Sequence, residues 1–299
     1  MVEAARKYNR VVQCGMQNRS IYGVRKAIEF LHSGELGEIY MAKGLCYKPR
    51  NTIGRKANAP IPEGLDYDMW LGPAQWRPYN PQYVHYNWHW FWDFGCTDLG
   101  NQGPHQMDIA RWGMNKHEMP KTIKCVGGKF AFVDDQETPN TQMATFEYAD
   151  GKILQFEVRG LYTNADDGIR IGNLFFGTKG WMHLDGDKWS TYFGFKNEAG
   201  PKFDGGGDVA DPSNLSGAGG SAHFMNFIDA VRAGNWMMLN GDVQEGHRST
   251  AMCHLANISN RLGRELHFND RTFRFIGDDE ANSYLTKEYR HPYVVPETV

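Results

Sequence analysis

Residues 141–159, TQMATFEYADGKILQFEVR, decide the fold of this chain. Two runs rich in apolar and β-branched residues, 141–148 and 153–159, flank Asp150-Gly151, a dipeptide typical of β-hairpin turns. Further strand-like runs at 121–132, 169–177 and 180–184 come before and after this hairpin without helices between them. Strands in such succession favour antiparallel pairing, because only parallel neighbours need long crossovers. The sequence therefore predicts an α+β fold around a large, mixed, mostly antiparallel open sheet with helices packed on one face.

Helices are predicted on both sides of this strand-rich region. Apolar residues recur at helical spacing from Val24 to Leu31, and Gly34 follows them, which predicts a helix over residues 22–33. Similar apolar stripes predict two later helices, around residues 224–231 and 251–262. Residues 1–9 favour a helix, and the short apolar run at 11–14 favours a brief strand after it. Residues 38–47 alternate as a strand, whereas residues 49–81 and 197–220, rich in Pro and Gly, are expected to be irregular.

Composition argues against several classes of protein. The 299 residues carry Lys+Arg 32 against Asp+Glu 35, a formal net charge of -3, and show no basic stripe, so no nucleic-acid partner is expected. No apolar run approaches the ~18 residues that a membrane span needs, so no membrane association is expected. The five cysteines are scattered and form no CxxC pair, which favours a reducing, cytoplasmic compartment over a disulfide framework or a structural zinc site.

Residues 83–94, YVHYNWHWFWDF, are unusually aromatic. If this segment is extended, Trp88 and Trp90 point to one side and His89 to the other, because side chains alternate along a strand. Flat rings beside hydrogen-bonding groups suit a sugar or polyol, so these three residues are candidate substrate-binding residues. The alternative, rings buried in a core or an oligomer interface, has equal weight. His85 and His89 would lie too far apart on a strand to share an ion, and no metal site is predicted.

Residues 98–113, DLGNQGPHQMDIARWG, carry the densest chemical signal. A Gly-rich turn leads into a helix from about Pro104, which places His105 and Asp108 in its first turn, close enough to meet. A histidine held by a carboxylate is a candidate general acid or base near neutral pH. A capped helix whose histidine only satisfies a backbone group is the equally weighted alternative. Two glycine clusters, 205–210 and 217–222, fit G-x-G-x-x-A but lack the preceding strand of a dinucleotide site, so a loop and a helix cap are expected.

Four stretches, in order along the chain, resemble the glucose-fructose oxidoreductase, inositol dehydrogenase and rhizopine catabolism (Gfo/Idh/MocA) family. They are VVQCGMQNRS at 11–20, GELGEI at 34–39, residues 95–113 with His105, and HFMNFIDAVRAG at 223–234. The resemblance implies the C-terminal portion of an enzyme in which a Rossmann domain binds NAD or NADP and an α+β domain binds the substrate. Members of the family mostly move hydride between the cofactor and sugars, polyols or their derivatives. The resemblance also implies a homo-oligomer formed through the open sheet.

The same resemblance implies roles for individual residues. His105 stands at the family's catalytic histidine, and Asn101 at a position usually held by Asp; because an amide cannot act as a base, Asp98 is a candidate replacement. Gln17 and Arg19 match the polar stretch close to the nicotinamide and the substrate. Gln17 is therefore the cofactor-binding candidate, and Arg19 a substrate-binding candidate.

The opening strand, the G-x-G-x-x-G turn and the Glu-Lys-Pro segment of the family are absent from this sequence. Residues 1–20 are interpreted as a remnant, the last helix and strand, of an NAD(P)-binding Rossmann domain, and residues 21–299 as the substrate-binding and oligomerisation domain. The favoured hypothesis is the C-terminal part of an NAD(P)-dependent oxidoreductase that binds the dinucleotide poorly, or not at all, on its own. Two alternatives stay open: a cofactor-independent sugar lyase, epimerase or hydrolase that uses His105, and a non-catalytic carbohydrate-binding oligomeric subunit.

Overall fold

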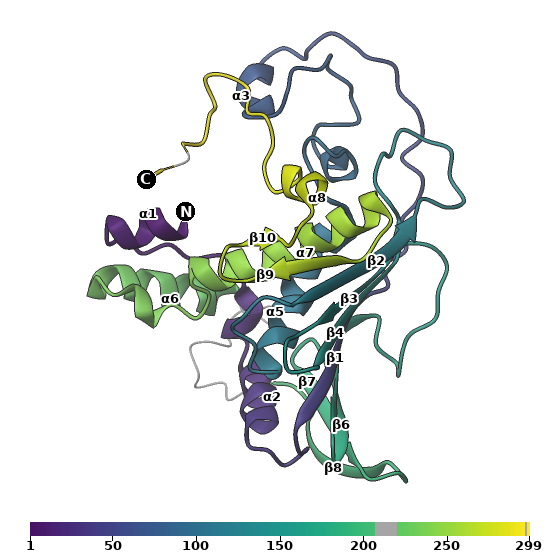
Figure 1. The fold of residues 1–299 in the computed structure, drawn as a ribbon, viewed down its shortest axis with the longest axis vertical. Coiled ribbons are helices and arrows are strands. Elements are labelled where there is room, and N and C mark those ends of the chain that lie inside the picture. The colour runs from purple at the N-terminus through teal and green to yellow at the C-terminus, as the bar shows by residue number, and fades with distance from the viewer. Residues whose placement is uncertain (207–219, 297) are drawn as a thin grey trace.

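The structure, a computed structural model, describes residues 1–206, 220–296 and 298–299. Its centre is a ten-stranded sheet with the strand order β10-β9-β2-β3-β4-β1-β5-β6-β7-β8 (Figure 1). The strands are β1 Ile39–Cys46, β2 Thr122–Gly128, β3 Thr141–Glu147, β4 Ile153–Arg159, β5 Ile171–Gly177, β6 Gly180–Asp185, β7 Lys188–Phe193, β8 Glu198–Phe203, β9 Leu266–Asn269 and β10 Arg274–Phe275. Strand β1 runs parallel to β4, and the other neighbours pair antiparallel, so the predicted mixed, mostly antiparallel sheet is confirmed.

The hairpin predicted from residues 141–159 lies near the middle of this sheet. Strands β3 and β4 pair from Thr141 opposite Arg159 to Glu147 opposite Ile153. The turn closes because the backbone N–H of Gly151 donates to the Tyr148 carbonyl at 3.0 Å, with Gly151 at φ 81°. Glycine tolerates this left-handed conformation without steric cost, which is why the Asp-Gly signal was a sound predictor.

The sheet extends further than the sequence indicated. Strand β8 lies inside the segment 197–220 that was expected to be an irregular loop, and β7 was not predicted at all. Strand β8 contains Pro201, which lacks a backbone N–H, and such a residue is tolerated on an edge strand because one side of the ladder needs no partner. The carbonyl of Pro201 accepts from the Thr191 hydroxyl at 2.6 Å. The rest of the expected loop, 207–219, lies outside the described residues.

Helices precede, interrupt and follow the strands. The helices are α1 Val2–Lys7, α2 Tyr22–His32, α3 Tyr67–Leu71, α4 Thr97–Asn101, α5 Gly103–Gly113, α6 Gly220–Ala233, α7 Val243–Leu262 and α8 Asp279–Ser283, with 3-10 turns η1 Gln17–Ser20, η2 Asn87–Trp90 and η4 Trp236–Met238. The predicted helices at 22–33 and 251–262 are confirmed as α2 and part of α7. The brief strand expected after α1 is wrong: the structure has only an isolated bridge between Gln13 and Asp242, since no strand of the described residues lies beside this segment to pair with it.

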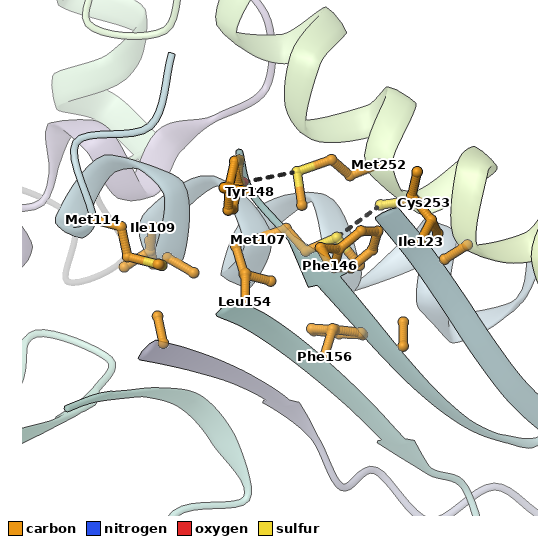
Figure 2. Close-up of a cluster of buried hydrophobic side chains, with 14 of the residues drawn as sticks. Met107, Ile109, Met114, Ile123, Phe146, Tyr148, Leu154, Phe156, Met252 and Cys253 are labelled. Carbon is orange, nitrogen blue, oxygen red and sulfur yellow. Dashed lines mark hydrogen bonds between the residues drawn. The ribbon is translucent and has the colours of Figure 1, made fainter. Parts of the chain in front are cut away.

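Helices α5 and α7 pack against one another on one face of the sheet, with α5 against β1, β4 and β5 and α7 against β2 (Figures 1 and 2). The Met107 side chain is fully buried, and its sulfur lies 3.8 Å from the Cys253 thiol of α7. Phe146 and Phe156 of the sheet are also fully buried in this cluster (Figure 2). Burying such a side chain contributes roughly 1.5–3 kcal/mol, so this packing fixes the position of α5 and of the residues at its start.

Helix α6 carries the predicted apolar stripe but does not bury all of it. Phe224, Ile228 and Val231 are 70%, 38% and 47% exposed, so they form an apolar surface on the described part of the chain. None of the helices in the described ranges is both long and apolar enough to cross a membrane.

Candidate active site

The start of α5 places His105 where the sequence predicted it. Instead of a simple Gly-rich turn, the preceding residues form the short helix α4, and Gln102 joins the two helices. The hydroxyl of Thr97 organises the start of α4, because it donates to the Gln142 side chain at 2.8 Å and accepts from the Leu99 backbone at 2.9 Å. Pro104 then lies in the first turn of α5, a position where its missing N–H costs no helical hydrogen bond.

His105 lines a cleft of about 330 Å³ between η1, α5, β5 and the turn after β6. Among the described residues, the polar side chains that surround His105 in this cleft are mostly neutral amides, with one carboxylate, that of Asp185; the amides are Gln17, Asn18, Gln102, Gln106 and Asn173. Each amide offers both a donor and an acceptor. The lining therefore suits a ligand rich in hydroxyl groups better than a strongly charged one.

His105 is held as a neutral imidazole. Burial lowers its pKa below the ordinary value, and the nearby Asp108 charge opposes this only in part. Its Nδ1 atom is buried and has no hydrogen-bond partner among the described residues. A neutral imidazole at neutral pH can accept a proton, which is the property a general base needs.

Asp108 does not orient His105 through a hydrogen bond, which corrects the predicted pairing. Its carboxylate accepts from Arg19 at 2.7 Å and 2.9 Å, and from the Ser249 hydroxyl at 2.9 Å. The same guanidinium also contacts Glu245 at 3.3 Å. A buried carboxylate needs such a cation, because removing the charge from water is costly. In this structure Arg19 therefore forms ion pairs with Asp108 and Glu245. Asp108 affects His105 only through its charge.

Asp98 is also paired. Arg50 donates two hydrogen bonds to its carboxylate, at 2.9 Å and 2.7 Å, and the Asp98 side chain is 2% exposed. The Asn101 amide donates to it at 3.3 Å, while Asn101 itself is exposed and does not line the His105 cleft. Both carboxylate oxygens of Asp98 are occupied by the Arg50 guanidinium, so Asp98 as arranged here is not a free base beside His105.

The aromatic segment 83–94 is not a strand. It forms turns and the 3-10 helix η2, so the predicted row of rings on one side does not occur. Trp90 and His89 are buried at 4% and 5% exposure, whereas Trp88 is 40% exposed. No strand in the described part of the chain lies beside this segment, and its rings pack in a separate cluster that includes Tyr67 and Tyr83. The burial of these rings against other rings therefore outweighs the period-two pattern that favoured a strand.

Trp88 lines a second cleft, of about 300 Å³, with Trp70, Phe94 and Asp93. This cleft and the His105 cleft share no lining residue. The candidate residue Gln17, by contrast, lies in the same cleft as His105. The structure therefore brings Gln17 and His105 together and leaves Trp88 in a different hollow.

Several cleft residues were missed by the sequence reasoning, and Asn173 is the clearest. It is fully buried in β5, within the otherwise apolar run IGNLFFG. A polar amide inside a buried strand is costly unless it is bonded, which is a signal that could have singled it out. Gln106 could have been found as the side chain next to His105 on the same helix turn.

Other sequence signals lead to no site in the described part of the chain. No group of three or more His, Cys, Asp or Glu side chains gathers there as for a metal ion. Of the two glycine clusters, residues 207–210 and 217–219 lie outside the described residues.

The sequence itself matches the C-terminal alpha/beta domain of the Gfo/Idh/MocA oxidoreductase family over residues 39–169 and 183–295. The chain belongs to this family. The match includes β1, the helix that carries His105, and the whole hairpin of β3 and β4. A search of curated protein sequences found no match.

Solved structures of this family share the fold. The WlbA dehydrogenase from Bordetella pertussis, in complex with NADH and UDP-GlcNAcA, is 17% identical with a TM-score of 0.59, covering 90% of this chain and 66% of that one. Levoglucosan dehydrogenase, in complex with NADH and levoglucosan, is 15% identical with a TM-score of 0.62, covering 89% and 68%. The aldose-aldose oxidoreductase from Caulobacter crescentus, complexed with glycerol, is 14% identical with a TM-score of 0.60, covering 89% and 67%. The chain thus spans about two thirds of the length of these proteins.

Proposed function

We propose that this chain is the substrate-binding part of an NAD(P)-dependent oxidoreductase that acts on a sugar, a polyol or a derivative of one. Membership of the Gfo/Idh/MocA family supports the reaction class. The neighbours crystallised with NADH and a sugar ligand support the substrate class by analogy. In this proposal residues 1–20 belong to the dinucleotide-binding domain and residues 21–299 bind the substrate.

The observation that carries the proposal is the composition of the His105 cleft. A neutral imidazole stands at the first turn of α5, surrounded by side-chain amides from η1, α5 and β5. Amides can donate to and accept from vicinal hydroxyls, while the imidazole can remove a proton from one of them. His105 is the proposed proton acceptor. Asn101, an exposed amide, has no acid–base role in this scheme.

The described residues fit a nicotinamide dinucleotide only in part. Gln17 lies in the cleft with His105, where its amide could contact the reacting end of such a cofactor. The strands of the described sheet provide no Gly-rich turn between a parallel strand and a helix that would cradle a pyrophosphate. We therefore propose that this chain by itself binds NAD(P) weakly or not at all. A bound dinucleotide supplies hydride transfer; the residues described here bind the substrate and handle the proton.

Calorimetry of the chain with myo-inositol, D-glucose and levoglucosan, and separately with NADH, tests this function. We expect at least one of the three polyols to bind and NADH to bind more weakly. His105→Ala should lower the affinity for the polyol by about tenfold, as expected for a lost buried hydrogen bond. His267→Ala is the matched control, because the His267 side chain is 57% exposed and lies outside the cleft.

The outcomes separate the competing hypotheses. Binding of none of the three polyols would overturn the proposed substrate class. Conversion of a polyol by the chain without any nucleotide would instead support the cofactor-independent enzyme. Polyol binding that is unaffected by His105→Ala would exclude the imidazole and favour a carbohydrate-binding subunit.

A further inference from the structure

We propose that Asn173 determines specificity in the His105 cleft, where its side-chain carbonyl accepts a hydrogen bond from one hydroxyl of the ligand. This inference rests on the proposed function, since it concerns the sugar or polyol bound beside His105. It names a requirement on the ligand: a hydroxyl donor at one fixed position.

The location of Asn173 is set by an unusually close approach of helix to sheet. On β5 it pairs with Gly44 of β1, and the missing side chain there lets α5 come close. A Cβ added to Gly44 would lie 3.0 Å from the Cβ of Gln106 and 2.8 Å from the Phe156 ring. Because of this approach, the Asn173 amide nitrogen reaches the Gln106 carbonyl at 2.9 Å.

That hydrogen bond fixes which end of the amide is left without a partner. Nδ2 must point to the Gln106 carbonyl, because the reverse orientation would bring two oxygens together. Oδ1 is therefore the end of the amide that does not bond to Gln106. Asn173 is 0% exposed, and its Oδ1 atom is buried without a hydrogen-bond partner among the described residues.

An acceptor buried without a partner is unfavourable in the free protein and gains most from a donor that reaches it. Asn173 lines the same cleft as His105, so a ligand in that cleft can supply the donor. A hydroxyl fits, because it donates to Oδ1 and still accepts from neighbouring amides. A carbonyl, a carboxylate or a methoxy group at that position has no proton to donate, and its oxygen would meet Oδ1 without compensation.

The first experiment leaves the protein unchanged. The tightest of myo-inositol, D-glucose and levoglucosan is replaced in turn by its mono-deoxy and mono-O-methyl analogues, and each affinity is measured by calorimetry. We expect one hydroxyl whose removal and whose methylation both weaken binding by about tenfold or more, as for a lost hydrogen bond to a buried group. Equal tolerance of every single substitution would overturn the inference.

The second experiment assigns that hydroxyl to Asn173. The variant Asn173→Leu keeps the size of the side chain but removes its carbonyl, so it should bind the parent ligand about tenfold more weakly and should no longer distinguish it from the critical analogue. Such non-additivity reports a direct contact, whereas a purely structural role would weaken both ligands and keep the tenfold difference between them. Additive losses would therefore contradict the proposal.

Thr191→Val serves as the control variant. Thr191 is 1% exposed in β7 and donates to the Pro201 carbonyl, so its replacement disturbs a buried polar group outside the cleft. We expect it to keep the tenfold discrimination. The two proposals fail separately: no polyol binding by the unchanged chain would contradict the proposed function, while binding with full discrimination by Asn173→Leu would contradict only the role of Asn173.

Discussion

At the scale of single residues, His223 shows how burial and hydrogen bonding select one form of a side chain. It is 4% exposed, and its Nε2 atom lies 2.8 Å from the Cys14 carbonyl. A carbonyl can only accept, so Nε2 carries the proton and Nδ1 accepts from the Ser20 hydroxyl at 2.9 Å. Burial lowers the pKa of His223, because the protonated ring would lose its water. The neutral ring thereby ties α6 to the segment that precedes the cleft residues of η1.

We expect His223→Gln to destabilise the protein by about 1–3 kcal/mol near pH 7.5, because it removes two buried hydrogen bonds. The pKa of His223 is lower in the folded chain than its ordinary 6.5, so its contribution is fully present above pH 6.5 and is lost as the pH falls below that value. The difference between the variant and the unchanged chain should therefore shrink at about pH 5.5. Urea unfolding at both pH values measures it.

The control for this experiment is His267→Gln, on a side chain that is 57% exposed. It should change the free energy of unfolding by less than about 0.5 kcal/mol at either pH, as surface substitutions usually do. A constant difference between His223→Gln and the unchanged chain at both pH values would contradict the assignment of a neutral ring.

At the scale of elements, the short helix α4 is anchored by a buried ion pair. Arg50, in the loop after β1, makes two hydrogen bonds to Asp98 of α4 and lies 5.3 Å from the centroid of the Trp90 ring. The hydrogen bonds to Asp98 raise the pKa of Arg50, so the guanidinium stays charged at every accessible pH. Because α4 leads directly into α5, this pair helps to set where His105 stands.

Removing only one partner of this ion pair should strongly destabilise the protein. Arg50→Met leaves the Asp98 carboxylate buried without its cation, and we expect a loss of about 3–5 kcal/mol in the free energy of unfolding. The double variant Arg50→Met, Asp98→Asn removes the stranded charge and should recover part of that loss. Urea denaturation of the three chains provides the measurement.

The exposed pair Arg264–Asp278 is the matched control, with an N–O distance of 2.9 Å and side-chain exposures of 41% and 22%. Arg264→Met should lower the free energy of unfolding far less than Arg50→Met does, because water screens a surface ion pair. An equally small loss in the free energy of unfolding for Arg50→Met would show that the buried ion pair does not anchor α4.

At the scale of the whole molecule, the sheet has one face against the helices and one face partly open. Cys125 and Ala144 point toward the helices and are buried, so their neighbours Val126 and Met143 point to the opposite face. These two residues pair with one another and are 57% and 54% exposed. Exposed apolar neighbours on a sheet favour association.

We therefore predict a homo-oligomer in solution that uses this open face. Light scattering at micromolar concentration should give a mass of at least twice 34.1 kDa. Met143→Lys places a charge in the centre of the apolar pair and should shift the protein toward the monomer. The control is Val133→Lys, at a loop position that is 83% exposed and outside the sheet. A monomeric mass for the unchanged chain would rule the prediction out.

Local patterns were enough to predict the elements that depend on neighbours in the sequence. The hairpin at 141–159, helix α2, and the place of His105 in the first turn of α5 follow from turn chemistry and periodicity that act within a few residues. Local patterns were misleading for 83–94, where the rings alternate as in a strand but no described strand lies beside them to pair. They also missed β8, because an edge strand can form from a Pro- and Gly-containing segment once β7 is in place.

By itself, the sequence determined the class of fold, the family and the position of the candidate histidine. Only the tertiary structure decided the partner of each charged group. Asp108 pairs with Arg19, 89 residues earlier, and Asp98 pairs with Arg50, 48 residues earlier. The tertiary structure also decided that Asn173, rather than the aromatic segment, completes the His105 cleft. The physical reason is that periodicity and turn preferences are local, whereas a buried charge or amide takes whichever partner the packed chain brings within reach.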